Sequence, residues 1–234
     1  MGAAEGLENG FDNGESRVSV LPMLSFDLGR AVTLHLDGEY YDQRGRGYWH
    51  MVPATPETQH GDFSAIPWDL NMASPDDSWR GWNASGGLRL DARLSDGLAL
   101  HAAFRYTRID GDIDVQALAA LAADGHTAQR FAYREKSVWD EYQSDSFVTL
   151  GAKTGPLAHT VVAGVEAGLS TVDSRIGIGS APSLDIYAPV YGPKPELSLS
   201  PTGNDMLRVG IYAQDQIAKL PTEIRDQLAR KFAA

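Results

Sequence analysis

Alternation of apolar and polar residues with a period of two recurs along this sequence and constrains the fold more than any other feature. Successive side chains of a strand point to opposite faces, so the pattern predicts strands with one apolar and one polar face. Seven segments show it: Val18 to Leu28, Val32 to Tyr41, Leu88 to Leu94, Leu98 to Thr107, Ser144 to Ala152, Thr160 to Ser170 and Leu207 to Gln216. The sequence therefore predicts an all-β chain, an antiparallel meander of about seven long strands.

The connections between these segments alternate in length. Short turns join the first and second strands, the third and fourth, and the fifth and sixth: Leu28-Gly29-Arg30-Ala31, Ser95-Asp96-Gly97 and Lys153-Thr154-Gly155-Pro156. The glycine of the second turn is expected to supply the positive φ of a tight hairpin. The other links run to roughly thirty residues, which soluble sandwiches and barrels rarely show. Outer-membrane barrels do combine tight periplasmic turns with long extracellular loops.

Lipid is the expected neighbour of the apolar faces, and a polar lumen that of the charged faces. Aromatic residues near strand ends, such as Phe26, Tyr40 and Tyr106, favour this interpretation because such residues gather at membrane interfaces. Alternation alone does not separate a lipid-facing stripe from the packed face of a soluble sheet. A soluble all-β binding module that uses its loops for recognition therefore stays open as the alternative.

Composition narrows the function classes. The formal charge of -11 argues against nucleic acid as a partner, because phosphate backbones require a basic face. The chain has no cysteine, which excludes disulfides and thiolate chemistry. Twenty-four glycines and twelve prolines suit a turn-rich β chain. No apolar stretch reaches the length of a membrane-spanning helix, so any crossing must be made by strands.

Two segments depart from the strand pattern. Asp114 to Ala123 is rich in alanine and predicts a short helix within a loop. In the tail 218–234, Pro221 is followed by Ile224, Leu228 and Phe232 at four-residue spacing, which predicts a short C-terminal helix. Residues 1–16 are acidic and rich in glycine; we expect a flexible N-terminus there, without the features of a secretion signal.

Four sequence stretches carry a family resemblance. Gly210-Ile211-Tyr212-Ala213-Gln214-Asp215-Gln216-Ile217 resembles a strand of TonB-dependent siderophore receptors, and Leu184-Asp185-Ile186-Tyr187-Ala188-Pro189-Val190-Tyr191-Gly192 resembles the loop before it. His159-Thr160-Val161-Val162-Ala163-Gly164 and Leu36-Asp37-Gly38-Glu39-Tyr40-Tyr41-Asp42 resemble earlier strands. Their order and spacing are similar to the middle of that family's barrel, over residues 17–217.

The resemblance implies an open segment of a 22-stranded transmembrane barrel with long extracellular loops, located in the cell outer membrane. Such receptors import ferric siderophore, and energy reaches them through TonB and an N-terminal plug. The plug has no counterpart in this sequence, so we expect a fragment that does not transport alone and contacts TonB only through a plug it lacks. The tail 218–234 has no counterpart in the family. No intrinsic cofactor is implied; the ferric siderophore would be cargo.

Residues that could perform catalysis or bind metal have simpler explanations. Asp110, Asp112 and Asp114 alternate as in a calcium loop, but Val115 and Leu121 stand where an EF-hand needs glycine and glutamate, so we expect a polar hairpin tip. Glu39 and Glu166 are expected to form ion pairs in the lumen, although a glycosidase pair would make the chain a β-rich hydrolase. Ser180 lacks the glycines of a nucleophile elbow. We expect no enzyme and no metal site.

Aromatic and arginine side chains outside the central strands are the candidates for ligand contact. Flat rings can pack against the organic shell of a siderophore, and arginines can attract an anionic iron complex. Interfacial anchoring and solvated loop charges are the competing explanations. The predicted ligand-binding residues are Tyr48, Trp49, Trp68, Trp82, Trp139, Tyr187, Tyr191, Arg46, Arg80 and Arg134; Trp79 is a further loop aromatic.

Overall fold

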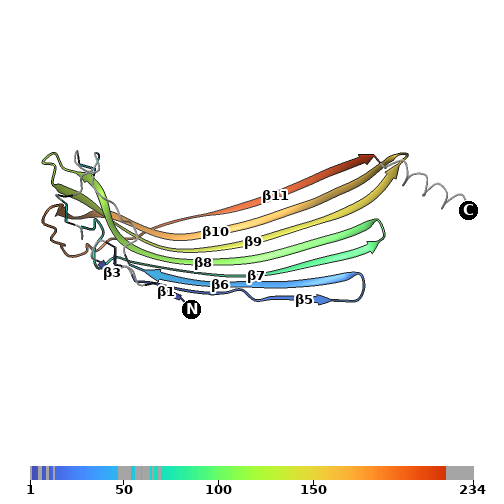
Figure 1. The fold of residues 1–234 in the computed structure, drawn as a ribbon, viewed down its shortest axis with the longest axis horizontal. Coiled ribbons are helices and arrows are strands. Elements are labelled where there is room, and N and C mark those ends of the chain that lie inside the picture. Colours follow the sequence, from blue (N-terminus) through green and yellow to red (C-terminus); the bar gives the residue numbers. More distant parts are fainter. Residues whose placement is uncertain are drawn as a thin grey trace, which may run out of the picture.

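A computed structural model of the protein describes residues 2–4, 7–8, 11–12, 14–46, 54–55, 59, 64, 66–67 and 70–219. Its main feature is one open antiparallel sheet, whose strands lie side by side from β1 to β11 (Figure 1). The sheet consists of β1 (Gly2–Ala4), β4 (Glu15–Val20), β5 (Met23–Asp27), β6 (Val32–Gly45), β7 (Ser78–Ser95), β8 (Leu98–Leu121), β9 (Thr127–Thr154), β10 (Leu157–Asp185) and β11 (Ser200–Lys219). A separate small pair is formed by β2 (Leu7–Glu8) and β3 (Phe11–Asp12).

All seven predicted strands are present, each paired with its neighbour in sequence order. The first is interrupted at Leu21-Pro22, and its two parts, β4 and β5, both pair with β6. Proline cannot donate to the ladder, but the pairing continues across the break because the Gly38 N–H donates to the Pro22 carbonyl at 2.9 Å. Pairing also extends beyond residues 17–217, into β1 within the expected flexible N-terminus and to Lys219 in β11. The predicted C-terminal helix falls on 220–234, outside the described residues.

The three short turns lie together at one end of the sheet, and the other connections lie at the opposite end (Figure 1). Gly29 and Gly155 adopt positive φ, of 92° and 58°. The positive φ predicted for Gly97 is wrong, because the φ of this residue is not positive. A shift of register between Arg93 and Ser95 turns the chain there instead, as β-bulges do.

Two predictions for the loop end are also wrong. Residues 114–123 form no helix: Asp114 to Leu121 continue β8, because β9 supplies backbone partners up to Leu121. The connections after β8 and β10 are consequently shorter than expected, at 122–126 and 186–199; only 46–77 has the expected length. A short connection after β8 is possible because Gly125 has φ 78° and the Asp124 carboxylate accepts hydrogen bonds from two backbone N–H groups.

Across the sheet, register separates an apolar face from a polar one. Residues paired directly opposite each other share a face. One row through the apolar face reads Leu24, Leu36, Leu88, Phe104, Ser144, Ala167, Val209. The next row on the polar face reads Ser25, His35, Arg89, Ala103, Asp145, Glu166, Gly210.

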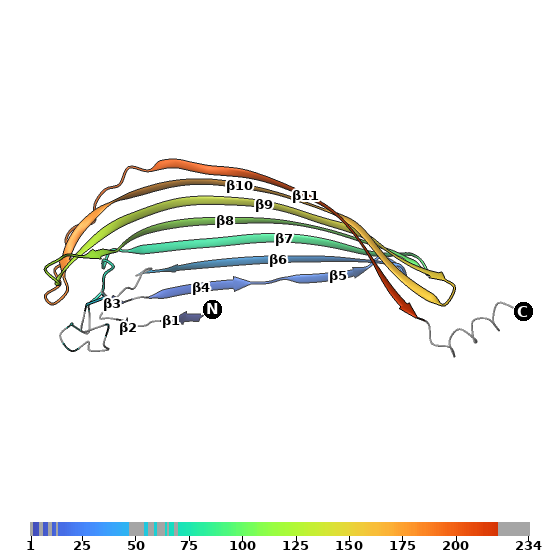
Figure 2. The same ribbon diagram turned by 90° about the horizontal axis from the view of Figure 1, so that it is seen from above.

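Nothing within the described chain covers the apolar face. Its large side chains are exposed, with Ile211 at 87% and Leu207 at 72%. The strands form a single arched layer (Figure 2). The same alternation would also occur in a soluble sheet whose apolar side packs against a second layer. In this structure the apolar stripe is not packed in that way.

The apolar face forms a band of defined height. It begins at the row of Tyr106, Tyr142, Leu169 and Leu207 and ends at the row of Leu98, Leu150 and Val161. These rows are eight residues apart along β10, roughly 27 Å at the rise of a strand. The rings of Tyr106 and Tyr142 lie 4.9 Å apart at the loop-side edge. The height and the aromatic edge match the lipid-facing surface of an outer-membrane barrel.

The part of the chain that the structure describes contains no helix with the length and apolar character needed to cross a membrane.

Candidate functional site: the polar face and the loop end

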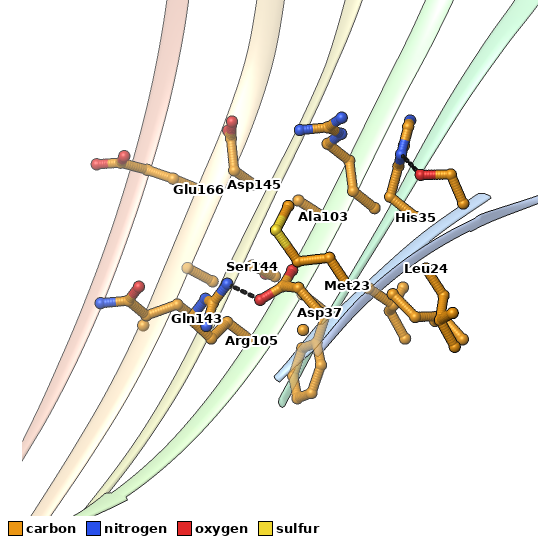
Figure 3. Close-up of a pocket in the computed structure, with 18 of the residues that line it drawn as sticks. Met23, Leu24, His35, Asp37, Ala103, Arg105, Gln143, Ser144, Asp145 and Glu166 are labelled. Carbon is orange, nitrogen blue, oxygen red and sulfur yellow. Dashed lines mark hydrogen bonds and ion pairs between the residues drawn. The ribbon is translucent and has the colours of Figure 1, made fainter. Parts of the chain in front are cut away.

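A hollow of about 560 Å³ lies on the polar face at the middle of the strands. Charged side chains from strands β6 to β11 meet there (Figure 3). Arg105 on β8 binds the Asp37 carboxylate on β6 and donates to the Ser85 hydroxyl at 3.0 Å. Because Arg105 spans β7 to reach Asp37, this contact crosses the neighbouring strand, where Gly87 leaves the space open.

Histidines and a carboxylate form a second group on the polar face, nearer to the short turns. Asp91 accepts contacts from His101 Nδ1 at 2.7 Å, Arg89 Nε at 3.1 Å and His35 Nε2 at 3.4 Å. His35 in turn lies 2.8 Å from the Ser25 hydroxyl. Every one of these side chains keeps part of its surface in solvent, so the group is a hydrated ion network.

Ion pairs and hydrogen bonds continue to the last strand. Arg208 contacts Glu141 at 3.3 Å, and the Tyr212 hydroxyl donates to Asp145 at 2.8 Å. The Tyr212 ring lies over Gly164, where a Cβ atom would approach it to 2.5 Å. Many charges of the polar face are therefore paired, as on the wall of a water-filled lumen.

The two glutamates considered as a glycosidase pair do not come together on this wall. Glu39 and Glu166 lie on β6 and β10, four strand spacings apart or roughly 19 Å, whereas glycosidase carboxylates lie within about 10 Å of each other. Asp110, Asp112 and Asp114 lie within β8, so the predicted hairpin tip at these residues is wrong. No group of three or more acidic or histidine side chains in the described ranges could hold a metal ion.

At the loop end the chain builds a small packed core. Leu70, Met72, Ala128, Leu184 and Ile186 are buried together. Tyr191 packs against them, and its hydroxyl donates to the Asn71 carbonyl at 2.9 Å. This core joins the end of connection 46–77 to the loop after β10.

Arg130 ties the end of connection 46–77 to the end of β10. Its side chain is only 3% exposed; it donates to the carbonyls of Pro182 at 2.8 Å and of Met72 and Ala73 at 3.2 Å each. Burial lowers the pKa of the guanidinium from its ordinary value, and the Tyr191 and Asp77 side chains oppose that shift. Such a clamp fixes the path of residues 72–73 against the end of β10.

A second link is made by Lys194. Its ammonium group contacts the Asp77 carboxylate at 3.3 Å and the Asp114 carboxylate at 3.1 Å, and donates to the Asp114 carbonyl at 2.6 Å. Burial raises the pKa of Asp77, while N–H donors from Gln116 and Ser74 act against that rise. Sequence reasoning did not select Arg130, Asp77 or Lys194. No local pattern marks these residues, because their contacts join segments far apart in sequence, such as Arg130 and Met72 or Lys194 and Asp77.

The predicted aromatic ligand residues lie in different parts of the molecule. Tyr48, Trp49 and Trp68 lie outside the described residues. Trp139 stands on the polar face of β9, 43% exposed, and donates to the Ser170 hydroxyl at 2.6 Å. Trp82 pairs with Asp42 and Asp110 on the opposite face.

Two predicted tyrosines lie in the loop after β10. Tyr187 is exposed beside the Asp185 carboxylate, which accepts its N–H at 2.9 Å and whose pKa this hydrogen bond lowers. Tyr191 belongs to the packed core, which is a structural role.

The three predicted arginines come together. Arg46, Arg80 and Arg134 line a hollow of about 550 Å³ at the loop end. Arg80 shares its face with Leu88, because the two are an even number of positions apart, eight, along the unbroken register of β7. The three arginines therefore lie on the outer, apolar side of the sheet and not on the side of Trp139.

Comparison with solved structures defines the class of fold. No protein-family model matches the sequence, and no curated protein sequence matches it. Solved structures do match, and all of those described below are receptors or transporters. The chain has the fold of a segment of an outer-membrane receptor barrel.

The similar structures define the fold more narrowly than that class. The ferric-catecholate import receptor Fiu from E. coli K12 matches with a TM-score of 0.73 at 18% identity, over 92% of this chain and 36% of that one. BauA, the ferric preacinetobactin receptor from Acinetobacter baumannii, matches with a TM-score of 0.66 at 16% identity, over 88% and 32%. The ferripyoverdine receptor of the outer membrane of Pseudomonas aeruginosa gives 0.63 and 14%, over 88% and 31%. The particular fold is therefore that of part of the barrel of TonB-dependent ferric siderophore receptors, and the chain spans about a third of their length.

Proposed function

We propose that this protein is a barrel segment of an outer-membrane receptor that takes up ferric siderophore, and that it does not transport alone. The observation that most supports this proposal is the separation of an apolar face from a polar face on the same sheet. A band of exposed apolar side chains, edged by tyrosines, backs a wall of paired charges on the same strands. A single-layer sheet of this kind suits lipid on one side and a hydrated lumen on the other.

The open edges of the sheet support the proposal that the barrel is incomplete. Among the described strands, β11 pairs only with β10, so its other backbone edge has no partner. Lipid cannot satisfy unpaired backbone groups, which is why membrane barrels close. We expect the chain alone to aggregate or to stay peripheral on vesicles. Liposomes loaded with a small solute should retain it when the chain is added; solute release equal to that of a closed porin would contradict this part of the proposal.

For the ligand, the proposal selects the predicted residue that faces the lumen side, Trp139. Its exposed ring could pack against a ferric siderophore. Trp82 provides a matched control. It is also a tryptophan, but it lies on β7 and on the opposite face of the sheet from Trp139. Tyr187, Tyr48, Trp49 and Trp68 stay predictions of the sequence.

The test is quenching of tryptophan fluorescence by ferric catecholate, hydroxamate and carboxylate siderophores, added to the whole chain in detergent. Saturable quenching by one class is expected; it should weaken about tenfold in Trp139→Ala, as for an aromatic contact of 1–3 kcal/mol, and persist in Trp82→Ala. Absence of saturable binding for all three classes, or its loss in Trp82→Ala alone, would contradict the ligand proposal.

A further inference from the structure

The loop half of the polar face carries an excess of negative charge. We name it the acidic patch: the polar-face residues of β4 to β11 from the row of Glu141 to the row of Tyr133. Among the described residues of this patch, the charged side chains are Glu15, Glu39, Glu135, Glu141 and one cation, Arg17. Arg17 is already paired with Glu15 at 2.6 Å, so it does not compensate the other carboxylates.

Trp139 lies in the middle of the acidic patch. Its partners across the neighbouring strands are Ile109 and Val172, so the exposed ring lies between apolar side chains. Along β9 and on the same face, Glu141 follows it by two residues and Glu135 precedes it by four, roughly 7 and 13 Å away. A molecule that packs on the ring therefore meets carboxylates in both directions along the strand.

Both carboxylates keep much of their charge. Within the described chain, Glu135 accepts hydrogen bonds from uncharged groups, the hydroxyls of Ser174 at 3.2 Å and of Tyr133. Glu141 contacts Arg208 at 3.3 Å, and both of these side chains keep part of their surface in solvent. An ion pair that is exposed to solvent neutralises little of the field of its carboxylate.

The arginines that would offset this charge lie elsewhere. Arg46, Arg80 and Arg134, which the sequence suggested as attractants for an anionic iron complex, lie on the opposite face. Arg17 on β4 is four strand spacings from β9, roughly 19 Å, which exceeds the Debye length of about 8 Å in physiological salt. An anionic ligand at Trp139 is therefore repelled by the acidic patch.

Ferric siderophores differ in charge because their iron-binding groups do. Three hydroxamates with a single negative charge each neutralise the ferric ion, whereas three catecholates with a double charge each leave a strongly anionic complex. We propose that the acidic patch selects neutral or cationic ferric hydroxamate complexes over anionic ones. Trp139 packs against the organic shell, and Glu135 and Glu141 set the charge preference. This inference rests on the proposed function, since it names the class of cargo for the same receptor.

The test uses a single linear ferric trihydroxamate with three different end groups. A free amine, an acetylated amine and a succinylated amine make the end cationic, neutral and anionic while the iron core stays the same. Quenching of tryptophan fluorescence of the whole chain in detergent measures the affinity for each complex. The cationic complex should bind about fivefold more tightly than the anionic one, or better. The difference should shrink at about 1 M salt, where the Debye length is roughly 3 Å.

Two double variants locate the preference. Glu135→Gln/Glu141→Gln should remove it while leaving the ring of Trp139 in place. Asp110→Asn/Asp173→Asn removes the same charge from the opposite face at the height of this ring and should keep the preference. If the first variant does not fold, Glu135→Gln alone should still reduce the preference, because the described contacts of this carboxylate involve no cation.

The remaining outcomes overturn the inference and separate it from the receptor assignment. Equal affinity for the three complexes, or a preference for the anionic one, contradicts the role of the acidic patch and leaves uptake of ferric siderophore standing. Equal loss of preference in both double variants means that the net charge of -11 sets it, and not the patch. Absence of saturable binding for every complex contradicts the proposed function itself, and this inference with it.

Discussion

Two adjacent alanines on β8 offer a sharp test of which face meets lipid. Ala102 lies in the middle row of the apolar band, four residues from both the Tyr106 and the Leu98 rows. Ala103 is its neighbour on the polar face, opposite Arg89 and Asp145. Substituting arginine at either position changes the charge and volume of the chain identically, so only the environment differs.

The expected magnitudes differ by orders of magnitude. An arginine facing lipid at the midplane of the bilayer costs about 2–4 kcal/mol, so Ala102→Arg should weaken lipid binding roughly 30- to 700-fold. At Ala103 the new side chain enters the hydrated hollow, where Asp145 offsets the repulsion by Arg89; such exposed pairs contribute about 0–1 kcal/mol. Ala103→Arg should therefore change lipid binding by less than about fivefold.

The assay is a urea titration of the chain in mixed micelles of phosphatidylcholine and detergent, followed by tryptophan fluorescence. Ala102→Gln and Ala103→Gln, which add bulk without charge, serve as controls for packing. Equal effects of the two arginine substitutions, or a larger effect at Ala103, would refute the assignment of the faces.

Three further predictions concern local structure. Gly164→Ala should displace the ring of Tyr212 and weaken its hydrogen bond to the neighbouring carboxylate, observed as loss of the tyrosine's restricted rotation by NMR in detergent; an unchanged ring would contradict it. Arg130→Met leaves buried carbonyls without donors, at about 1–3 kcal/mol each, so proteolysis of 182–199 should accelerate about tenfold or more, whereas unaltered proteolysis would show that the clamp is dispensable. Hydrogen bonds from the hydroxyl and N–H of Thr127 lower the pKa of Asp124 to about 2. Because this pKa is depressed from 3.8, the stabilisation of the turn is complete above that value and is lost as the pH falls towards 2; amide exchange at Thr127 should follow, and a turn indifferent to pH would refute this.

Sequence reasoning predicted the strands well because the pattern has a direct physical cause. In β6, for example, Leu34 and Leu36 lie on the apolar face and His35 and Asp37 line the hollow on the polar face, as the alternation requires. The turn glycines were predicted poorly. Positive φ was expected only at Gly97, where a bulge bends the chain instead, whereas Gly29 and Gly155 adopt it.

The loop end was predicted less well because long-range pairing decides its structure. Alanine favours helix locally, yet Ala117 is fully buried in β8, where Phe131 of β9 is its backbone partner. Likewise, the contacts of Arg130 join segments distant in sequence, so composition gave no signal for them. The arginine cluster was predicted as a set, but only the register assigns it to the outer side.

The most direct test of the account is accessibility along β8. The natural chain has no cysteine, so single cysteines can carry a spin label without further changes. In mixed micelles of phosphatidylcholine and detergent, labels should collide preferentially with oxygen, which concentrates in the apolar interior, at even positions and with a water-soluble nickel complex at odd ones. The series runs Leu98, Ala99, Leu100, His101, Ala102, Ala103, Phe104 and Arg105. A period of two with this phase is the predicted result; uniform accessibility, or the opposite phase, would contradict the claim that the apolar face of this sheet contacts lipid.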